Sequence, residues 1–240
     1  MESRRFFVFI LAVVVNAVKY DFNHKAVYYD QWYQTRHGRI YDKVEKRTID
    51  KILSKEKKGL AVLEVGCGTG HWSRYFSDKG SDVTGIDMSA EMIKIARQKN
   101  IPNSRFEVAD GRNLPFEKES FDLAVAITVL EFTTEPDKII SEMVRCIKKS
   151  HGSLVIGVLN AQNKYNQKRK NEPGSVYASA NLFSTKQIYR ILSAFGKVKL
   201  LTTGFIPPKE WLLGLSPLWE LAGCFFCPHK GAFIAARLDL

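Results

Sequence analysis

The chain has 240 residues, of which 45% are hydrophobic, so it is long enough to bury one α/β core as an ordinary globular protein with added segments. Lys and Arg number 36 against 25 Asp and Glu, and the net charge of +11 favours anionic partners such as nucleic acid, a membrane surface or an acidic small molecule. Four cysteines are too few for a disulfide framework, which indicates a reducing compartment.

Residues 1–20 form an apolar N-terminal segment. Two arginines precede an uninterrupted apolar run over 6–15, and Val15-Asn16-Ala17 resembles a signal-peptidase site. The apolar run is too short to span a bilayer comfortably. We therefore expect a membrane-surface anchor, a helix buried by a partner, or an upstream extension of the reading frame.

Strand-like and helix-like patterns alternate through the rest of the chain. The spacing of apolar residues predicts helices over 39–53, 71–79, 90–99, 135–148 and 184–194, with Ser89 as an N-cap. Apolar runs predict strands over 60–65, 82–87, 105–109, 121–128, 153–159, 197–203 and 232–238. This alternation predicts an α/β fold in which helices cover both faces of a mostly parallel sheet.

Three glycines, Gly66, Gly68 and Gly70, follow the first predicted strand and precede a helix. Glycines permit a ligand to approach the backbone closely, and the helix N-terminus offers unpaired N–H groups, so this turn is typical of nucleotide-type sites. A dinucleotide motif would need a third glycine at the position of His71. The pattern therefore weakens the interpretation as a pyrophosphate site.

Acidic residues stand at the ends of three consecutive predicted strands: Glu64, Asp87 and Asp110. Asp87 ends the second strand, where a carboxylate can accept hydrogen bonds from both ribose hydroxyls. Asp110 ends the third strand on the same edge of the sheet, well placed to accept a hydrogen bond from an adenine amino group. These acids predict an adenosine ligand that carries no phosphate.

Four segments, VLEVGCGTG (62–70), GIDMS (85–89), VADGRNLPF (108–116) and FDLAVAITVLEF (121–132), carry a family resemblance. In this order and spacing they resemble the motifs of class I S-adenosylmethionine-dependent methyltransferases, especially the small-molecule branch that includes ubiquinone and menaquinone methyltransferases. The resemblance is strong over 60–160. It implies a Rossmann-like three-layer sandwich with a seven-stranded sheet and an antiparallel last strand, and S-adenosyl-L-methionine as the cofactor.

The resemblance also implies roles for single residues. The three glycines would pass under the methionine and ribose portion, Asp87 would hold the ribose, and Asp110 would meet the adenine. Tyr29 and Tyr33 belong to a segment, 28–45, that resembles a lid over the cofactor, although aromatic packing onto the sheet explains them equally well. The implied cofactor-binding set is Glu64, Gly66, Gly68, Gly70, Asp87, Met88, Asp110, Gly111, Thr128, Tyr29 and Tyr33.

Methyl transfer is an in-line displacement that chiefly requires alignment of the acceptor and exclusion of water. The sequence assigns no catalytic residue; Glu131 and His71 lie at the correct edge for a general base, which is needed only if the acceptor must lose a proton. TVLEF stands where nucleic-acid amino-methyltransferases carry Asn/Asp-Pro-Pro-aromatic, which counts against nucleic acid. We expect transfer to a small organic, hydrophobic acceptor; an RNA methyltransferase and a non-catalytic cofactor-binding regulatory module stay open as alternatives.

The predicted organisation is the apolar segment 1–20, lid helices over 21–55 and a methyltransferase domain over 56–240 with an apolar insertion over 204–231. The insertion is expected to shape the acceptor pocket with the lid and the connection after the fifth strand, or to dip into a membrane. Cys224 and Cys227 lack an obvious fourth ligand, so no metal site is predicted. The basic run 164–170 is predicted to be a solvated connection. We expect a cytoplasmic protein, with membrane association as an open alternative.

Overall fold

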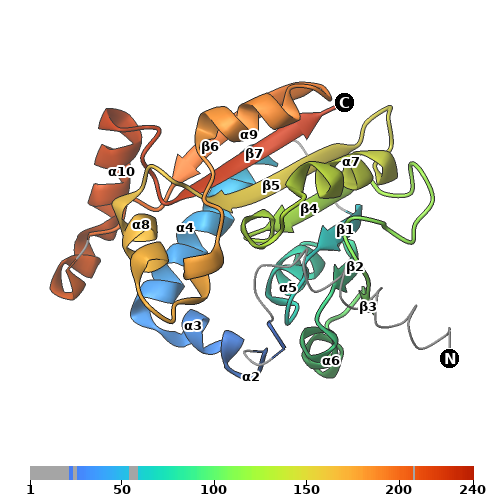
Figure 1. Cartoon of the computed structure of the whole chain (residues 1–240), viewed down its shortest axis with the longest axis horizontal. Helices are drawn as coiled ribbons and strands as arrows, with labels where there is room; N and C mark the ends of the chain where they lie inside the picture. The colour runs from blue at the N-terminus through green and yellow to red at the C-terminus, as the bar shows by residue number, and fades with distance from the viewer. Residues whose placement is uncertain (1–21, 24–25, 54–58, 208) are drawn as a thin grey trace, which may run out of the picture.

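A seven-stranded sheet forms the middle layer of the molecule (Figure 1). The computed structural model describes residues 22–23, 26–53, 59–207 and 209–240. Strand order is β3-β2-β1-β4-β5-β7-β6, and β7 runs antiparallel to both β5 and β6 while all other neighbours are parallel. The strands are β1 (Ala61–Val65), β2 (Asp82–Asp87), β3 (Ser104–Val108), β4 (Leu123–Ile127), β5 (Ser153–Leu159), β6 (Lys197–Thr203) and β7 (Phe233–Asp239). The predicted fold class is confirmed.

Helices cover both faces of this sheet. The longer ones are α4 (Arg36–Ile52), α5 (His71–Asp78), α6 (Ala90–Gln98), α7 (Pro136–Cys146), α8 (Lys164–Asn171), α9 (Thr185–Leu192) and α10 (Ser216–Phe226). Short turns of helix are α2 (Ala26–Tyr29), α3 (Gln31–Gln34), η2 (Leu130–Phe132), η3 (Val176–Ser179) and η4 (Glu210–Leu215). The predicted N-cap is confirmed, because the Ser89 side chain accepts a hydrogen bond from the Met92 N–H at the start of α6.

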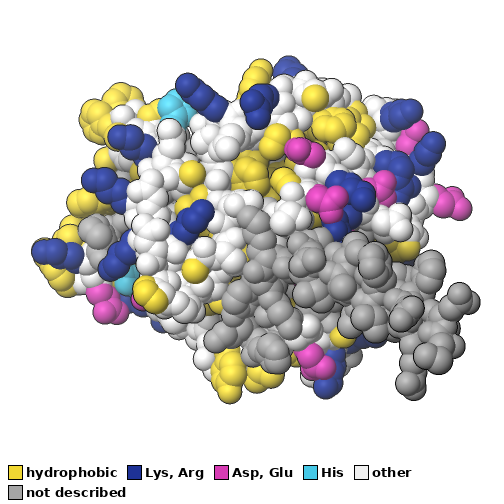
Figure 2. Space-filling view, viewed as in Figure 1, with side chains coloured by type: hydrophobic (Ala, Val, Ile, Leu, Met, Phe, Trp, Pro, Cys, Tyr) yellow, Lys and Arg dark blue, Asp and Glu magenta, His cyan; other side chains and the backbone are white. Residues whose placement is uncertain are grey.

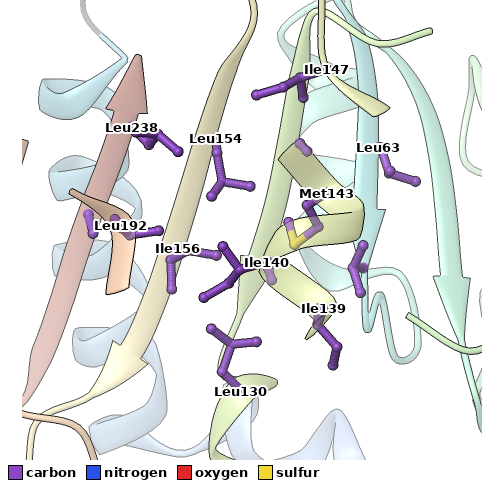
Figure 3. Close-up of a cluster of buried hydrophobic side chains, with 14 of the residues drawn as sticks. Leu63, Leu130, Ile139, Ile140, Met143, Ile147, Leu154, Ile156, Leu192 and Leu238 are labelled. Atoms are coloured by element: carbon purple, nitrogen blue, oxygen red, sulfur yellow. The ribbon is translucent and has the colours of Figure 1, made fainter. Parts of the chain in front are cut away.

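The hydrophobic core lies on both sides of the sheet. Figure 3 shows Ile139, Ile140 and Met143 of α7 beside Leu154 and Ile156 of β5. On the opposite face, α4 and α5 pack their apolar residues against the sheet. Burying one such aliphatic side chain contributes about 1.5–3 kcal/mol, so the two layers hold the strands rigidly and fix the positions of their carboxyl ends.

The connection after β5, predicted to be a solvated basic run, contains a helix, and its Lys164 and Lys168 are exposed. Residues 164–171 form helix α8, because the Asn163 side chain accepts hydrogen bonds from the N–H groups of Tyr165 and Asn166. Asn166 is only 2% exposed. Figure 1 shows α8 beside α3, beyond the carboxyl end of β5. The basic residues of this run therefore lie on a helix that packs against the lid.

Within the part of the chain that the structure describes, no helix is both long enough and apolar enough to cross a membrane. The predicted apolar segment 1–20 lies outside the described residues, so its role stays a prediction.

Candidate functional site

The glycine loop after β1 is hydrogen-bonded to the end of β2. The N–H groups of Gly66 and Cys67 both donate to the Ile86 carbonyl, at 2.8 and 2.9 Å. Gly66, Gly68 and Gly70 have φ of +71°, +53° and +80°. These left-handed conformations are strained for residues with a side chain, which is the first reason for the three glycines.

The second reason is the space available for a side chain, and it differs between Gly66 and Gly68. A Cβ on Gly66 would lie 2.3 Å from the Val129 Cγ2, so the fold itself excludes a side chain there. A Cβ on Gly68 would meet nothing closer than the Tyr29 Cε1, at 3.8 Å, and the Met92 Sδ, at 4.0 Å. The backbone at Gly68 thus borders open space beneath Tyr29. The space that a side chain at position 68 would occupy is free, so an adenosyl ligand could approach the backbone closely there.

Asp87, at the end of β2, binds the glycine loop through its carboxylate. Its carboxylate accepts hydrogen bonds from the N–H groups of Gly68, at 2.9 Å, and Ser89, at 2.8 Å. Burial raises the pKa of Asp87, and these backbone hydrogen bonds partly offset the rise. The predicted ribose-binding acid therefore also sets the conformation of the glycine loop.

Glu64, near the end of β1, is 2% exposed and accepts a hydrogen bond from the Ser73 hydroxyl at 2.5 Å. Burial raises the pKa of Glu64 to about 8, against the Ser73 hydrogen bond, which lowers it. Burial therefore favours the protonated form of this side chain. Its hydrogen bond with Ser73 joins β1 to α5.

This buried acid predicts a pH-dependent stability. The folded protein holds a proton on Glu64 that the unfolded chain releases above its ordinary pKa of 4.5, so the free energy of unfolding should fall as pH rises from 4.5 to about 8. We expect Glu64→Gln, which keeps the size and an acceptor for Ser73, to lose less stability across this range than the wild type. Urea unfolding at pH 5 and pH 8 tests this, with the exposed Glu117→Gln as the control. Equal losses in Glu64→Gln and wild type would contradict it.

Asp110 and its neighbours occupy the end of β3. The Arg112 guanidinium forms a two-pronged ion pair with Asp110, with a shortest contact of 2.6 Å, and also reaches Glu135 at 2.6 Å. Although partial burial works against it, these hydrogen bonds lower the pKa of Asp110. Gly111 is buried against Val65, whereas Met88 stays partly exposed next to Asp87. The sequence did not predict the ion pair between Arg112 and Asp110. This pair holds the Asp110 side chain in place and favours its ionised form.

The lid, α2 to α4, is attached to the loop by polar contacts. Asp30 accepts a hydrogen bond from the Thr69 hydroxyl at 2.7 Å and pairs with Lys99 at 2.6 Å. Tyr33 stacks on the His71 ring with centroids 3.6 Å apart, and the His71 Nε2 lies 2.7 Å from Asp42. His71 is not among the described residues that line the cavity beneath the lid. It ties the lid to α5 rather than facing an acceptor.

A cavity of about 290 Å³ lies between the lid and the carboxyl ends of β4 and β5. Its walls come from α2–α4, from Thr128 and Phe132 after β4, and from α8 and η3. Tyr29 and Tyr33 both line it, and Tyr29 also stands over the Gly68 backbone. Of the predicted cofactor-binding residues, Tyr29, Tyr33 and Thr128 line this cavity, whereas the glycine loop, Asp87 and Asp110 are not among its described lining residues. Its described lining is Phe22, Tyr28, Tyr29, Trp32, Tyr33, Tyr41, Glu45, Trp72, Thr128, Phe132, Leu159, Asn166, Arg169, Val176, Tyr177 and Ala232.

The turn directly after β4 contains a strained backbone position. Thr128 has φ of +54°, which is rare for a β-branched residue and costs about 1–3 kcal/mol. Its N–H donates to the Gly157 carbonyl at 2.7 Å, and the next residue, Val129, fills the space left by Gly66. Glu131 follows in η2, fully buried, with its carboxylate accepting from the Leu159 N–H at 2.5 Å. Strain at this turn brings Thr128 to the cavity wall.

None of the described residues of the apolar insertion lines this cavity. Instead, η4 and α10 sit at the far end of the sheet, and α10 borders a separate groove of about 760 Å³ with α4, α9 and β6. The Glu220 carboxylate accepts from the N–H groups of Gly204 and Phe205 at 3.0 and 2.8 Å, and Gly223 packs on the Phe205 ring. These contacts hold α10 by one face against β6, away from the lid.

Several cavity residues were not predicted from the sequence: Trp32, Tyr41, Glu45, Asn166, Arg169 and Tyr177. Helical spacing offered a weak signal, since Tyr41 and Glu45, like Asn166 and Arg169, lie on one side of their helices. Which side faces a cavity depends on how α4 and α8 pack, and spacing alone does not reveal it.

The chain is similar to known proteins in sequence and in fold. A family described as "Methyltransferase domain" matches residues 63–156. The uncharacterized protein MJ1123 of Methanocaldococcus jannaschii is 32% identical over 177 residues, covering 73% of this chain and 80% of that protein. The phosphatidylethanolamine N-methyltransferase of Cereibacter sphaeroides is 35% identical over 135 residues, 53% of this chain and 64% of that enzyme. A SAM-dependent methyltransferase structure from Thermotoga maritima, at 21% identity, shares the fold with a TM-score of 0.68 over 91% of this chain and 98% of that one.

These similarities agree with the strand order, the glycine loop and the acids at successive strand ends. The matched segment 63–156 contains the loop, Asp87 and Asp110, and it reaches into β5. The chain therefore belongs to the class I S-adenosylmethionine-dependent methyltransferases and is an enzyme that uses S-adenosyl-L-methionine as its methyl donor.

Proposed function

We propose that this enzyme methylates a small organic acceptor held in the lid cavity. The observation that carries the proposal is the position of that cavity, which reaches from Tyr29, the side chain next to the Gly68 backbone, to Tyr177 of η3. The space is lined mostly by aromatic rings and bounded by the lid helices. A cavity of about 290 Å³ suits a small molecule and is too confined for a folded macromolecule.

The proposal gives each part of the site a simple task. The glycine loop, Asp87 and Asp110 would hold the cofactor, as the family resemblance implies. S-adenosyl-L-methionine, when bound, supplies an electrophilic methyl group: the bond from the acceptor to the methyl carbon forms as the carbon–sulfur bond breaks and leaves its electron pair on sulfur. Tyr29 and Tyr33 would exclude water from the reacting atoms and orient the acceptor.

Turnover with different acceptor pools tests this assignment. We expect S-adenosylhomocysteine to accumulate when the enzyme and S-adenosyl-L-methionine are mixed with an extract of small metabolites, and not with total RNA. Acceleration by RNA alone would favour the RNA alternative, against which the confined cavity and the TVLEF segment argue. Liquid chromatography of the S-adenosylhomocysteine formed measures both arms.

We also propose that the outer face of α10 and η4 docks on an anionic membrane surface. Phe225, Phe226 and Trp211 are 79, 77 and 73% exposed, and Leu218 and Leu221 are 66 and 71% exposed. Figure 2 shows hydrophobic side chains at this end of the molecule bordered by Lys and Arg. Exposed aromatic and aliphatic side chains beside cations suit the interface of an anionic bilayer, and the net charge of +11 adds to the attraction.

Co-sedimentation with vesicles tests this surface. We expect the double variant Phe225→Ser, Phe226→Ser to bind phosphatidylserine-containing vesicles at least tenfold more weakly, because the interface loses two aromatic side chains that membrane binding would bury. Val108→Ser, at a 53% exposed position on the opposite edge of the sheet, is the matched control and should bind as the wild type does. Wild-type protein that stays in the supernatant, or equal binding of both variants, would contradict the proposal.

A further inference from the structure

The groove of about 760 Å³ beside α10 runs along β6, which lies at the edge of the sheet. Strand β6 pairs with β7 on one side, and no described strand pairs with its other side. Four consecutive residues of β6, 200–203, line the groove. A groove over one face of a strand would be lined by alternate residues, because successive side chains point to opposite faces. The groove therefore follows the edge of β6, where alternate backbone N–H and C=O groups point away from β7.

Helices from both faces of the sheet form the walls of this groove. Helix α4 contributes Val44 and Thr48, and it packs on the sheet through Ile49. Helix α9 contributes Thr185 and Tyr189, and it packs on the opposite face. Because α4 and α9 lie on opposite faces, the space between them opens onto the edge of β6. An extended chain placed there would meet the backbone of β6 between two helical walls.

Among the described residues, the unpaired charges of the groove are positive. Arg47 and Lys51 of α4 and Lys186 of α9 line the groove and are exposed. Within the described ranges their side chains make no ion pair or hydrogen bond. Glu220 is the one acid among the described lining residues, and its carboxylate already accepts hydrogen bonds from the Thr203 hydroxyl and from two backbone N–H groups. The groove therefore attracts carboxylates rather than ammonium groups.

We propose that β6 binds an extended, acidic segment of a partner protein, which adds to the sheet as a further strand. Main-chain hydrogen bonds to the edge of β6 would supply affinity, as they do wherever a peptide adds to an exposed sheet edge. Asp or Glu side chains of the segment would pair with Arg47, Lys51 and Lys186, and this pairing would select acidic partners. The groove is separate from the lid cavity, because no described residue lines both.

Two other occupants fit the groove less well. A second copy of the chain would place Lys197 and Lys199 of both β6 strands in one ladder, where like charges are destabilising. Lysines on an edge strand are also a common protection against self-association. RNA would pair its phosphates with the cations, but it offers no regular row of donors for the backbone carbonyls of β6.

Fluorescence anisotropy with labelled peptides tests the proposal on the full chain. The probe is an acidic peptide of about nine residues in which Glu and Val alternate, the length of an ordinary strand. We expect it to bind about tenfold more tightly than the same peptide with Lys in place of Glu, because the groove is basic. N-methylation at every internal peptide bond removes the donors that a ladder needs, and it should weaken binding about tenfold. An acidic peptide that fails to bind, or that binds equally well when N-methylated, would overturn the proposal.

Paired variants locate the peptide. Arg47→Gln, Lys51→Gln should bind the acidic peptide about tenfold more weakly than the wild type, because two cations leave the groove. The control, Lys94→Gln, Arg105→Gln, should bind as the wild type does. It also removes one Lys and one Arg, but these exposed residues lie on α6 and β3, at the opposite edge of the sheet. Equal affinities in the two double variants would show that net charge alone attracts the peptide, against the proposal.

Sedimentation velocity and competition identify the other occupants. A dimer of the free chain that the acidic peptide dissociates would assign the edge of β6 to a second copy and overturn the proposal. An RNA oligonucleotide would do the same if it bound more tightly than the peptide and lost affinity in Arg47→Gln, Lys51→Gln but not in the control. We expect neither result, because the free edge of β6 needs a partner with both backbone donors and backbone acceptors.

Discussion

Asp87→Asn should weaken the binding of S-adenosyl-L-methionine by about tenfold to a hundredfold, because charged hydrogen bonds contribute about 1.5–3 kcal/mol. The substitution keeps the size of the side chain and one acceptor oxygen. It removes the negative charge that would hold the ribose hydroxyls, and it weakens the hydrogen bonds from the Gly68 and Ser89 N–H groups that shape the loop. Both effects lower the affinity, which isothermal calorimetry measures.

Asp82→Asn is the matched control, since this exposed residue lies at the opposite end of the same strand, β2. It should bind the cofactor as the wild type does. Thermal unfolding of both variants separates a local loss of affinity from a loss of fold. An affinity of Asp87→Asn within twofold of the wild type would remove Asp87 from the cofactor site.

Gly66→Ala should lower the free energy of unfolding by about 2–5 kcal/mol. The left-handed conformation costs a non-glycine residue about 1–2 kcal/mol, and forcing a methyl group against a packed side chain costs about 1–3 kcal/mol more. Here φ is +71° and the new Cβ would lie 2.3 Å from the Val129 Cγ2. Urea unfolding measures the change, and a smaller m-value would indicate that the folded state had also loosened.

Gly80→Ala separates the two causes, because φ is +84° there and a Cβ would meet nothing within 4 Å. It should cost only the conformational part, about 1–2 kcal/mol. Equal losses in Gly66→Ala and Gly80→Ala would show that the contact with Val129 is unimportant. Gly68→Ala provides the complementary case: with φ of +53° and an open cradle, it should cost as little stability as Gly80→Ala while weakening cofactor binding.

The glycine loop, Asp87 and Asp110 could be predicted as cofactor-binding residues because each stands at or just after the end of a predicted strand. In a parallel sheet the carboxyl ends of neighbouring strands meet at one edge, so Asp87 and Asp110 could be placed near the glycine loop from chain order alone. Only the tertiary structure showed that Arg112 holds Asp110, that Ser73 supports Glu64, and that Gly66 makes room for Val129. These partners are set by which side chains happen to meet after packing, and no spacing rule encodes them.

The residues that line the lid cavity were predicted in part. The lid and the connection after β5 do line the cavity, whereas the apolar insertion over 204–231 lies at the other end of the sheet. Its hydrophobic composition suggested a pocket wall, but hydrophobic residues such as Phe225 and Leu221 are exposed just as readily when a helix packs by its other face. Composition says how apolar a segment is and not what it touches.

The sequence alone determined the fold class and, through the resemblance of its motifs, the family and the cofactor, because strand periodicity and these motifs are properties of short stretches of chain. The tertiary structure decided the cavity and its chemistry. Glu45, Asn166 and Arg169 come from α4 and α8, which are far apart in sequence, and they line one cavity only because the lid and α8 pack over the carboxyl ends of β4 and β5. Long-range packing, which no local pattern records, brings these side chains together.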